Sequence, residues 1–149
     1  MSDFIEIRLD NKELQQALNK LAEKASNLRP LMKNIAGIFE DSVEENFEQQ
    51  GRPKWEGLKK PTIERRVKKG YWPGKILQMR GELAASITSN YDENSATVGT
   101  NKVYAAIHQF GGEAGKNKKV KIPARPYLKL GDQEKSQIFK EIEKFLDEK

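Results

Sequence analysis

Apolar residues recur every three to four positions along three stretches of the chain, which is the spacing of one buried face of a helix. The longest runs from residue 31 to about residue 50, with apolar side chains on one face and mostly acidic side chains on the other. Another follows Asp10 or Asn11, either of which can cap a helix, and the last follows Asp132. The three stripes are Leu14, Ala17, Leu18, Leu21 and Ala25; Leu31, Met32, Ile35, Phe39, Val43 and Phe47; and Ile138, Phe139, Ile142, Phe145 and Leu146. We therefore predict an N-terminal helix, a long central helix with Pro30 in its first turn, and a C-terminal helix.

Three short segments alternate between apolar and polar residues, which is the pattern of a half-buried strand. They span residues 4–9, 87–91 and 96–100. The last two are separated by the turn-forming residues Asp92, Glu93 and Asn94, so they predict a hairpin. Residues 122–130 contain two prolines and are restricted to an edge strand or an extended segment. The fold class predicted is α+β, a single domain over residues 1–149 with a small antiparallel sheet packed against the long helix and with additional N- and C-terminal helices.

The segment 51–75 has no sustained apolar period and contains three prolines, so we predict a long loop anchored by Trp55. Within it, residues 62–69 have the composition for a helical turn or two. Residues 76–86 resume a helical pattern.

A short buried helix is predicted from Val103 to Phe110, because its apolar residues have helical spacing and Gly111 can end it in a left-handed conformation. Residues 112–121 are polar, basic and glycine-containing, which predicts a second loop. We expect the two loops, near 51–75 and 112–121, to be mobile.

Positive charge is concentrated in these two loops. Residues 51–75 carry nine basic and two acidic side chains, a net +7, and residues 116–129 carry six basic and no acidic ones, a net +6. Because the whole chain has a net charge of +5, the remainder carries −8. The chain is therefore predicted to be an acidic body with two basic loops, which disfavours a broad nucleic-acid-binding face.

The composition also excludes several classes of chemistry. The chain has no cysteine, which excludes disulfides, thiolate metal sites and cysteine nucleophiles. No signal-peptide pattern begins the sequence and no apolar run approaches membrane-spanning length, so we expect a soluble protein of a reducing compartment with no membrane partner.

His108 is the chain's one histidine and invites a hydrolytic triad with Ser86 or Ser89 and Asp92. No nucleophile-elbow motif accompanies these serines, so we interpret His108 as structural and expect no catalytic residue. The chain has one histidine, and its acidic residues lie mainly on the solvent faces of helices, so we predict no metal site. The glycine-containing segments match no phosphate-binding loop, so we expect no cofactor.

The basic loops are the strongest candidates for function. They favour a protein interface in which they contact acidic surfaces of neighbouring copies, a head-to-tail contact that closes a ring. Contact with nucleic acid is the alternative, with phosphate binding by Lys and Arg and base stacking on aromatic residues. The third interpretation is that the loops are solvated and have no function. The candidate interface residues are Arg52, Trp55, Arg65, Arg66, Trp72 and Arg125. Arg125 precedes a proline, which favours extended backbone and suits an interface anchor or a buried ion-pair partner, with a plain surface arginine as the alternative.

An ordered set of short motifs resembles the phage virion morphogenesis family, whose members are also described as tail completion proteins. The motifs are Gly81-Glu82-Leu83 with Ser86-Ile87, Val98-Gly99-Thr100-Asn101, residues 104–112 (YAAIHQFGG) and residues 122–128 (IPARPYL), preceded by Gly51, Trp55, Leu58, Thr62 and Arg66. The resemblance implies a small sheet crossed by a long helix. It also implies a non-enzymatic virion component that acts in tail completion or head–tail joining. Its expected partners are other tail or connector proteins, and its expected site of assembly is the host bacterial cytoplasm.

Overall fold

The fold is organised around one long helix, α2 (Arg29–Glu48), which contacts both the sheet and the C-terminal helix. The computed structural model describes residues 5–6, 12–24, 27–78, 81–102, 104–115, 117 and 120–147. The other helices are α1 (Lys12–Lys24), α3 (Lys60–Lys69), α4 (Glu82–Ala85), α5 (Ala105–Phe110) and α6 (Asp132–Asp147). The strands are β1 (Ile5–Glu6), β2 (Thr88–Tyr91), β3 (Ala96–Thr100), β4 (Gly112–Ala114) and β5 (Val120–Ile122). The predicted α+β class is confirmed.

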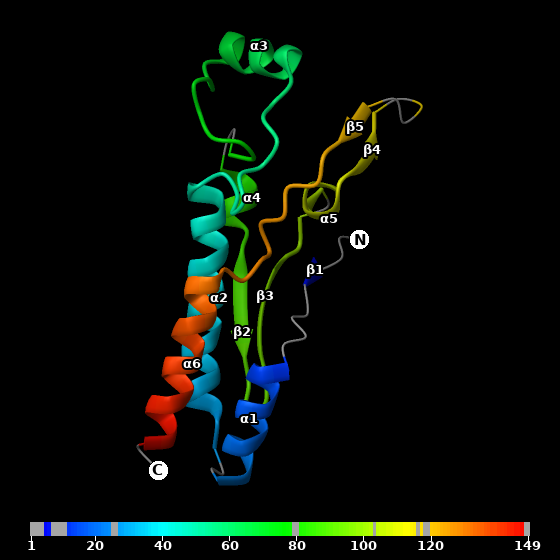
Figure 1. Ribbon diagram of the computed structural model, residues 1–149. Coiled ribbons are helices and arrows are strands. Elements are labelled where there is room, and N and C mark those ends of the chain that lie inside the picture. Colours follow the sequence, from blue (N-terminus) through cyan, green and yellow to red (C-terminus); the bar gives the residue numbers. More distant parts are fainter. Residues whose placement is uncertain are drawn as a thin grey trace.

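Helices α1, α2 and α6 bury the stripes that the sequence pattern assigns to them. Figure 1 shows α6 running alongside α2, with α1 near the end of α2 where that helix begins. Leu21, Leu31 and Ile138 are among the fully buried side chains of this first core cluster. Burial of each such side chain contributes about 1.5–3 kcal/mol of hydrophobic free energy. Pro30 lies in the first turn of α2, as predicted.

A three-stranded antiparallel sheet, in the order β1-β3-β2, packs against α2. The predicted hairpin is confirmed, since Ser89 pairs with Val98 and Tyr91 with Ala96. β1 pairs Ile5 with Thr100. The rest of the predicted first strand, the cap at Asp10 or Asn11 and the stripe residue Ala25 lie outside the described residues.

The second core cluster joins α2 to the segments that carry the candidate site. It contains Val43, Phe47, Trp55, Leu83 and Tyr127, which come from four separate parts of the chain. The ring of Phe47 lies 5.9 Å from that of Trp55 and 5.2 Å from that of Tyr127, centroid to centroid. Such aromatic pairs contribute roughly 0.5–1.5 kcal/mol beyond their buried area.

The segment 51–75 is more regular than predicted, because α3 is a ten-residue helix. The apolar pattern underestimates it because Arg66, a charged residue, is its buried position, while Val67 is 54% exposed. Pro61 lies in the first turn of α3, and Gly70 ends the helix at φ +79°.

The predicted helix over residues 76–86 is wrong for most of its length. Helix α4 covers Glu82–Ala85 alone, and residues 79–80 lie outside the described residues. Leu77 has φ +64° and Gly81 has φ +72°, backbone conformations that cannot continue a right-handed helix. Ile76 and Leu83 are nevertheless buried, which is the property that produced the helical pattern.

The prediction that residues 112–121 form an irregular loop is also wrong, because β4 and β5 form an antiparallel pair. The predicted helix before it is confirmed in part, as α5, but Phe110 is 62% exposed rather than buried. The buried positions of α5 are Ala105 and Gln109, one turn apart. Figure 1 shows α3 and the β4–β5 hairpin extending from the body as two separate projections.

Candidate functional site

Trp55 anchors residues 51–75, the first basic segment, to the core, as the sequence predicts. Its ring is buried against Phe47, and its Nε1 donates a hydrogen bond to the carbonyl oxygen of Pro126 at 3.1 Å. The segment that leads to α3 is thereby fixed to the segment that follows β5.

Arg52 ties the same segment to both long helices. Its Nε donates to Asn46 Oδ1 at 2.7 Å in α2, and its Nη1 donates to Glu134 Oε1 at 2.8 Å in α6. Its Nη2 donates to the carbonyl oxygen of Ser42 at 3.0 Å. Since Glu134 is 5% exposed, this ion pair is largely removed from water, and each charge depends on the other.

Arg125 and Arg66 hold the base of the projection that carries α3. Arg125 Nε donates to Glu56 O at 3.0 Å and its Nη2 donates to Gly57 O at 3.1 Å. Arg66 Nη1 donates to Lys75 O at 3.0 Å, in the segment that follows α3. Burial lowers the pKa of Arg125; the carboxylate of Glu56 raises it, and the charge of Arg66 lowers it. Burial lowers the pKa of Arg66 as well.

The six predicted contact residues therefore fall into two groups. Arg52, Trp55, Arg66 and Arg125 donate hydrogen bonds to residues nine or more positions away in their own chain. Arg65 is exposed and donates to Thr62 Oγ1 at 3.3 Å, while Trp72 is half-buried. Contact with a partner by any of the six stays a prediction.

The predicted acidic face of α2 borders a groove of about 300 Å³. Glu40, Glu44 and Glu48 form its charged side, and the apolar side chains of Val43, Phe47, Ala84 and Ile87 form its floor together with Gln78. Glu48 pairs with Lys75 from the first basic segment. The sequence predicts the acidic face, but the apolar floor depends on Ala84 of α4 and Ile87 before β2 lying against α2.

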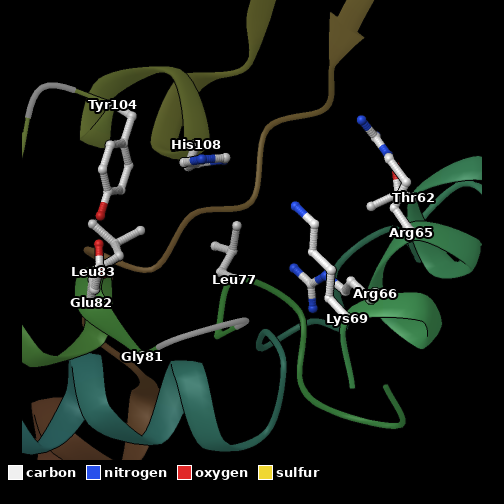
Figure 2. Close-up of a pocket in the computed structure, with 10 residues that line it drawn as sticks. All are labelled: Thr62, Arg65, Arg66, Lys69, Leu77, Gly81, Glu82, Leu83, Tyr104 and His108. Atoms are coloured by element: carbon white, nitrogen blue, oxygen red, sulfur yellow. The ribbon is translucent and has the colours of Figure 1, made fainter. Parts of the chain in front are cut away.

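A second concavity, of about 460 Å³, lies between α3 on one side and α4 and α5 on the other. Figure 2 shows its lining residues: Thr62, Arg65, Arg66, Lys69, Leu77, Gly81, Glu82, Leu83, Tyr104 and His108. We call this space the α3–α5 cleft. Sequence reasoning missed it because no local pattern indicates that residues 62–69 face residues 104–108.

His108 lines the α3–α5 cleft, and the suggested triad is not assembled around it. Ser86 Oγ donates to Leu83 O at 2.6 Å and is hydrogen-bonded to Thr100 Oγ1. Asp92 lies in the exposed β2–β3 turn, where it accepts hydrogen bonds from Asn94 and Ser95. Within the described part of the chain no three or more His and acidic side chains gather closely enough to hold a metal ion. None of the helices there is long and apolar enough to span a membrane.

Comparison with known proteins places the chain among phage proteins. Residues 9–147 match the phage virion morphogenesis family. The chain is 45% identical to Mu-like prophage FluMu G protein 2 of Haemophilus influenzae, covering 95% of this chain and 96% of that protein. It is 34% identical to the putative capsid assembly protein G of Escherichia phage Mu, covering 97% and 95% of the two chains. No solved structure matches. The chain therefore belongs to the phage virion morphogenesis family, which confirms the resemblance carried by its motifs and gives it a role in phage assembly.

Proposed function

We propose that this protein is a non-enzymatic virion component that acts in tail completion or head–tail joining as a ring of identical subunits. In each contact of the ring, α3 of one copy lies against the acidic face of α2 of the next. The observation that carries this proposal is the separation of charge in one chain. Cations lie on a helix that stands apart from the body, and acids lie on the longest helix of the body (Figure 1).

The charges on the two helices have few partners within one copy. The exposed cations of α3 are Lys60, Arg65, Lys68 and Lys69, and the exposed acids of α2 are Glu40, Asp41, Glu44 and Glu48. Among the described residues, the Lys75–Glu48 ion pair is the one that joins the first basic segment to this acidic face. A contact between two different surfaces of identical subunits is heterologous, and it closes into a ring when the rotation between copies permits.

The shapes and apolar residues of the two surfaces also support this contact. Val67 is exposed on α3, flanked by cations, and the groove beside α2 presents the half-buried apolar side chains of Ala84 and Ile87 near its acids. An apolar centre surrounded by charged side chains is the usual anatomy of a protein interface. Arg52, Trp55 and Arg125 would then hold α3 in position, while Arg65 and Trp72 contact the neighbour.

In the same proposal, the remaining partners are other tail or connector proteins, and assembly takes place in the cytoplasm of the bacterial host. Because the family match and the phage relatives establish a role in phage assembly, the finer choice between completing a tail and joining it to a capsid depends on these partners.

Light scattering on protein eluting from gel filtration tests the ring. We expect oligomers at low ionic strength that dissociate as salt rises, because exposed charge pairs are screened. Reversing Lys60 and Lys68 to Glu should give monomers, as should reversing Glu40 and Glu44 to Lys, and combining the two pairs should restore the oligomer. Reversal of Lys20 in α1 and Lys140 in α6, both exposed and outside α2 and α3, serves as the control. A wild-type chain that stays monomeric at low salt, with and without tail tubes, would contradict the ring.

Nucleic-acid binding is a second candidate, favoured by the four exposed cations of α3 and by the half-buried Trp72 that follows them. It predicts binding to duplex DNA whose affinity falls steeply with salt and disappears when Lys59, Lys60, Lys68 and Lys69 are reversed. An electrophoretic shift assay at low salt measures this, and the absence of a shift would remove the candidate.

A further inference from the structure

The α3–α5 cleft has the chemistry of a binding site that shares Arg65 and Lys69 with the proposed ring contact but is otherwise built from different residues. We propose that it binds an acidic peptide segment of another virion protein, with a carboxylate against the cations of α3 and a neighbouring apolar side chain on the floor of the cleft. Its volume of about 460 Å³ is in the range of sites that enclose a small ligand or a few residues.

One wall of the cleft is cationic and partly fixed in place. It is formed by Arg65, Arg66 and Lys69, and none of the three forms an ion pair among the described residues. Figure 2 shows the guanidinium of Arg66 and the ammonium of Lys69 directed into the space between α3 and α5. Because Arg66 is 9% exposed and is held by the carbonyl of Lys75, its remaining N–H groups are oriented before any ligand arrives.

The opposite wall offers neutral donors. The rings of Tyr104 and His108 meet edge to face at 5.9 Å. Nδ1 of His108 is buried and has no hydrogen-bond partner among the described residues. A proton on Nδ1 would therefore be a buried donor without an acceptor, so the neutral imidazole favours the tautomer with its proton on Nε2. Burial lowers the pKa of His108 and the charge of Arg125 lowers it further, which keeps the ring neutral at pH 7. Nε2–H is then available to an acceptor in the cleft.

The residues on the floor of the cleft favour a peptide over a nucleic acid as the ligand. Leu77 lies between the two polar walls, while Leu83 lies beneath Tyr104 and Glu82 places a negative charge at the edge (Figure 2). An apolar floor suits a side chain such as Leu beside a carboxylate. A phosphodiester backbone would bring repeated charges past Glu82 and would leave the floor without an apolar partner.

The cleft is complete within one chain, so the proposal does not depend on ring formation. All ten lining residues come from the same copy. The charge reversals that test the ring, at Lys60 and Lys68, lie on α3 but do not line the cleft. The two proposals can therefore fail independently of each other.

His108 supplies a direct reporter because it is the chain's one histidine, so its ring protons give one set of proton NMR signals. The probe is the acetylated and amidated tetrapeptide Asp-Leu-Glu-Leu, titrated into the full-length protein. We expect saturable shifts of the His108 signals and a rise in the pKa of His108, because a bound carboxylate stabilises the imidazolium. The neutral tetrapeptide Asn-Leu-Gln-Leu should give no saturable shift.

Variants of α3 provide the matched controls. Replacing Arg65 and Lys69 together with Ala should weaken binding of the acidic probe about tenfold or more, because two charge-assisted contacts are lost. Lys68→Ala, on the same helix outside the cleft, should change the affinity less than about twofold. Equal weakening by Lys68→Ala, equal binding of the neutral peptide, no shift at millimolar probe, or tighter binding by a 12-base-pair DNA duplex would each overturn the proposal. A protein that light scattering shows to be monomeric would leave it standing if the titration gives the expected shifts.

Discussion

Gln109 shows how a single buried polar side chain joins segments that lie apart in the sequence. Its Oε1 accepts hydrogen bonds from the backbone N–H groups of Tyr127 at 3.1 Å and Leu128 at 2.9 Å. The extended segment after β5 has no sheet partner there, so the side chain of α5 satisfies its donors. Asn46 does the same from α2, because its Nδ2 donates to the carbonyls of Tyr127 and Lys129 at 2.8 Å.

Replacing Gln109 with Leu should lower the free energy of unfolding by about 2–6 kcal/mol, because two buried N–H groups lose their acceptor at about 1–3 kcal/mol each. Urea denaturation followed by circular dichroism measures this loss. Gln133→Leu, on the exposed face of α6, is the control and should change stability by less than about 0.5 kcal/mol. A loss at position 109 no larger than the control's would contradict the role of the amide.

His108 gives the stability a pH dependence of known sign. Its pKa in the folded state is lowered by burial and by Arg125, below the value of about 6.5 expected in the unfolded chain. As pH falls through the unfolded value, the unfolded state binds a proton that the folded state does not, so folding becomes less favourable. This contribution is fully present above about pH 6.5 and is lost on the acid side.

We therefore expect His108→Gln to lose less stability than the wild type between pH 7.5 and pH 5. The difference between the two urea-unfolding profiles isolates the histidine, since the carboxylates titrate in both proteins. Parallel profiles across this range would show that the folded and unfolded pKa values of His108 are alike.

At the scale of elements, α3 is stabilised by hydrogen bonds of a buried polar side chain rather than by an apolar stripe. Its buried residue is Arg66, whose hydrogen bond to Lys75 O spans the turn that follows the helix. A helix of ten residues is marginal on its own in water, so its order comes from such contacts and from its ends at Pro61 and Gly70.

Arg66→Ala should increase amide hydrogen exchange in residues 60–70 by about 5- to 30-fold, corresponding to about 1–2 kcal/mol of local stability. Mass spectrometry of peptides after exchange measures this, and peptides from α2 should change little. Arg65→Ala is the matched control, because the hydrogen bond from Arg66 to the carbonyl oxygen of Lys75 remains in that variant. Equal exchange in the two variants would mean that Arg66 does not order α3.

The Arg52–Glu134 ion pair is the corresponding tie between the first basic segment and α6. Arg52→Met leaves the Glu134 carboxylate buried without its partner, and we expect a loss of about 3–5 kcal/mol in the free energy of unfolding. Replacing both residues with Met should cost much less, since no lone charge remains. Urea denaturation of the four proteins gives the coupling energy. Additive losses would show that the two side chains do not depend on each other.

At the scale of the whole molecule, the proposed ring places α3 of one copy beside α2 of the next. The chain has no cysteine, so pairs of introduced cysteines report this contact without a background. We expect the variant with Lys68→Cys and Glu44→Cys to form a ladder of disulfide-linked oligomers under mild oxidation, visible on non-reducing gels. Each single variant should stop at dimers. A double variant that gives no species above dimer would place the contact elsewhere.

The sequence by itself determined the features that follow from local periodicity and turn chemistry. These are the amphipathic helices α1, α2 and α6, the β2–β3 hairpin around Asp92, the anchoring of a basic segment by Trp55 and the separation of acidic from basic regions. Each is encoded within one segment, because a helical stripe, an alternating strand or a run of charge can be counted without knowing its neighbour. The family resemblance has the same origin, since its motifs are short and ordered along the chain.

The tertiary structure alone decided which polar residues form buried hydrogen bonds between separate segments. Arg66, Gln109 and Arg125 are buried because carbonyls or N–H groups from other segments meet them, and a sequence pattern does not identify those partners. For the same reason it underestimated α3, extended α4 too far and missed the β4–β5 pair. The α3–α5 cleft also depends on bringing residues 62–69 to residues 104–108. Hydrogen bonds and charges gain their value from partners far along the chain, and only the folded molecule brings those partners together.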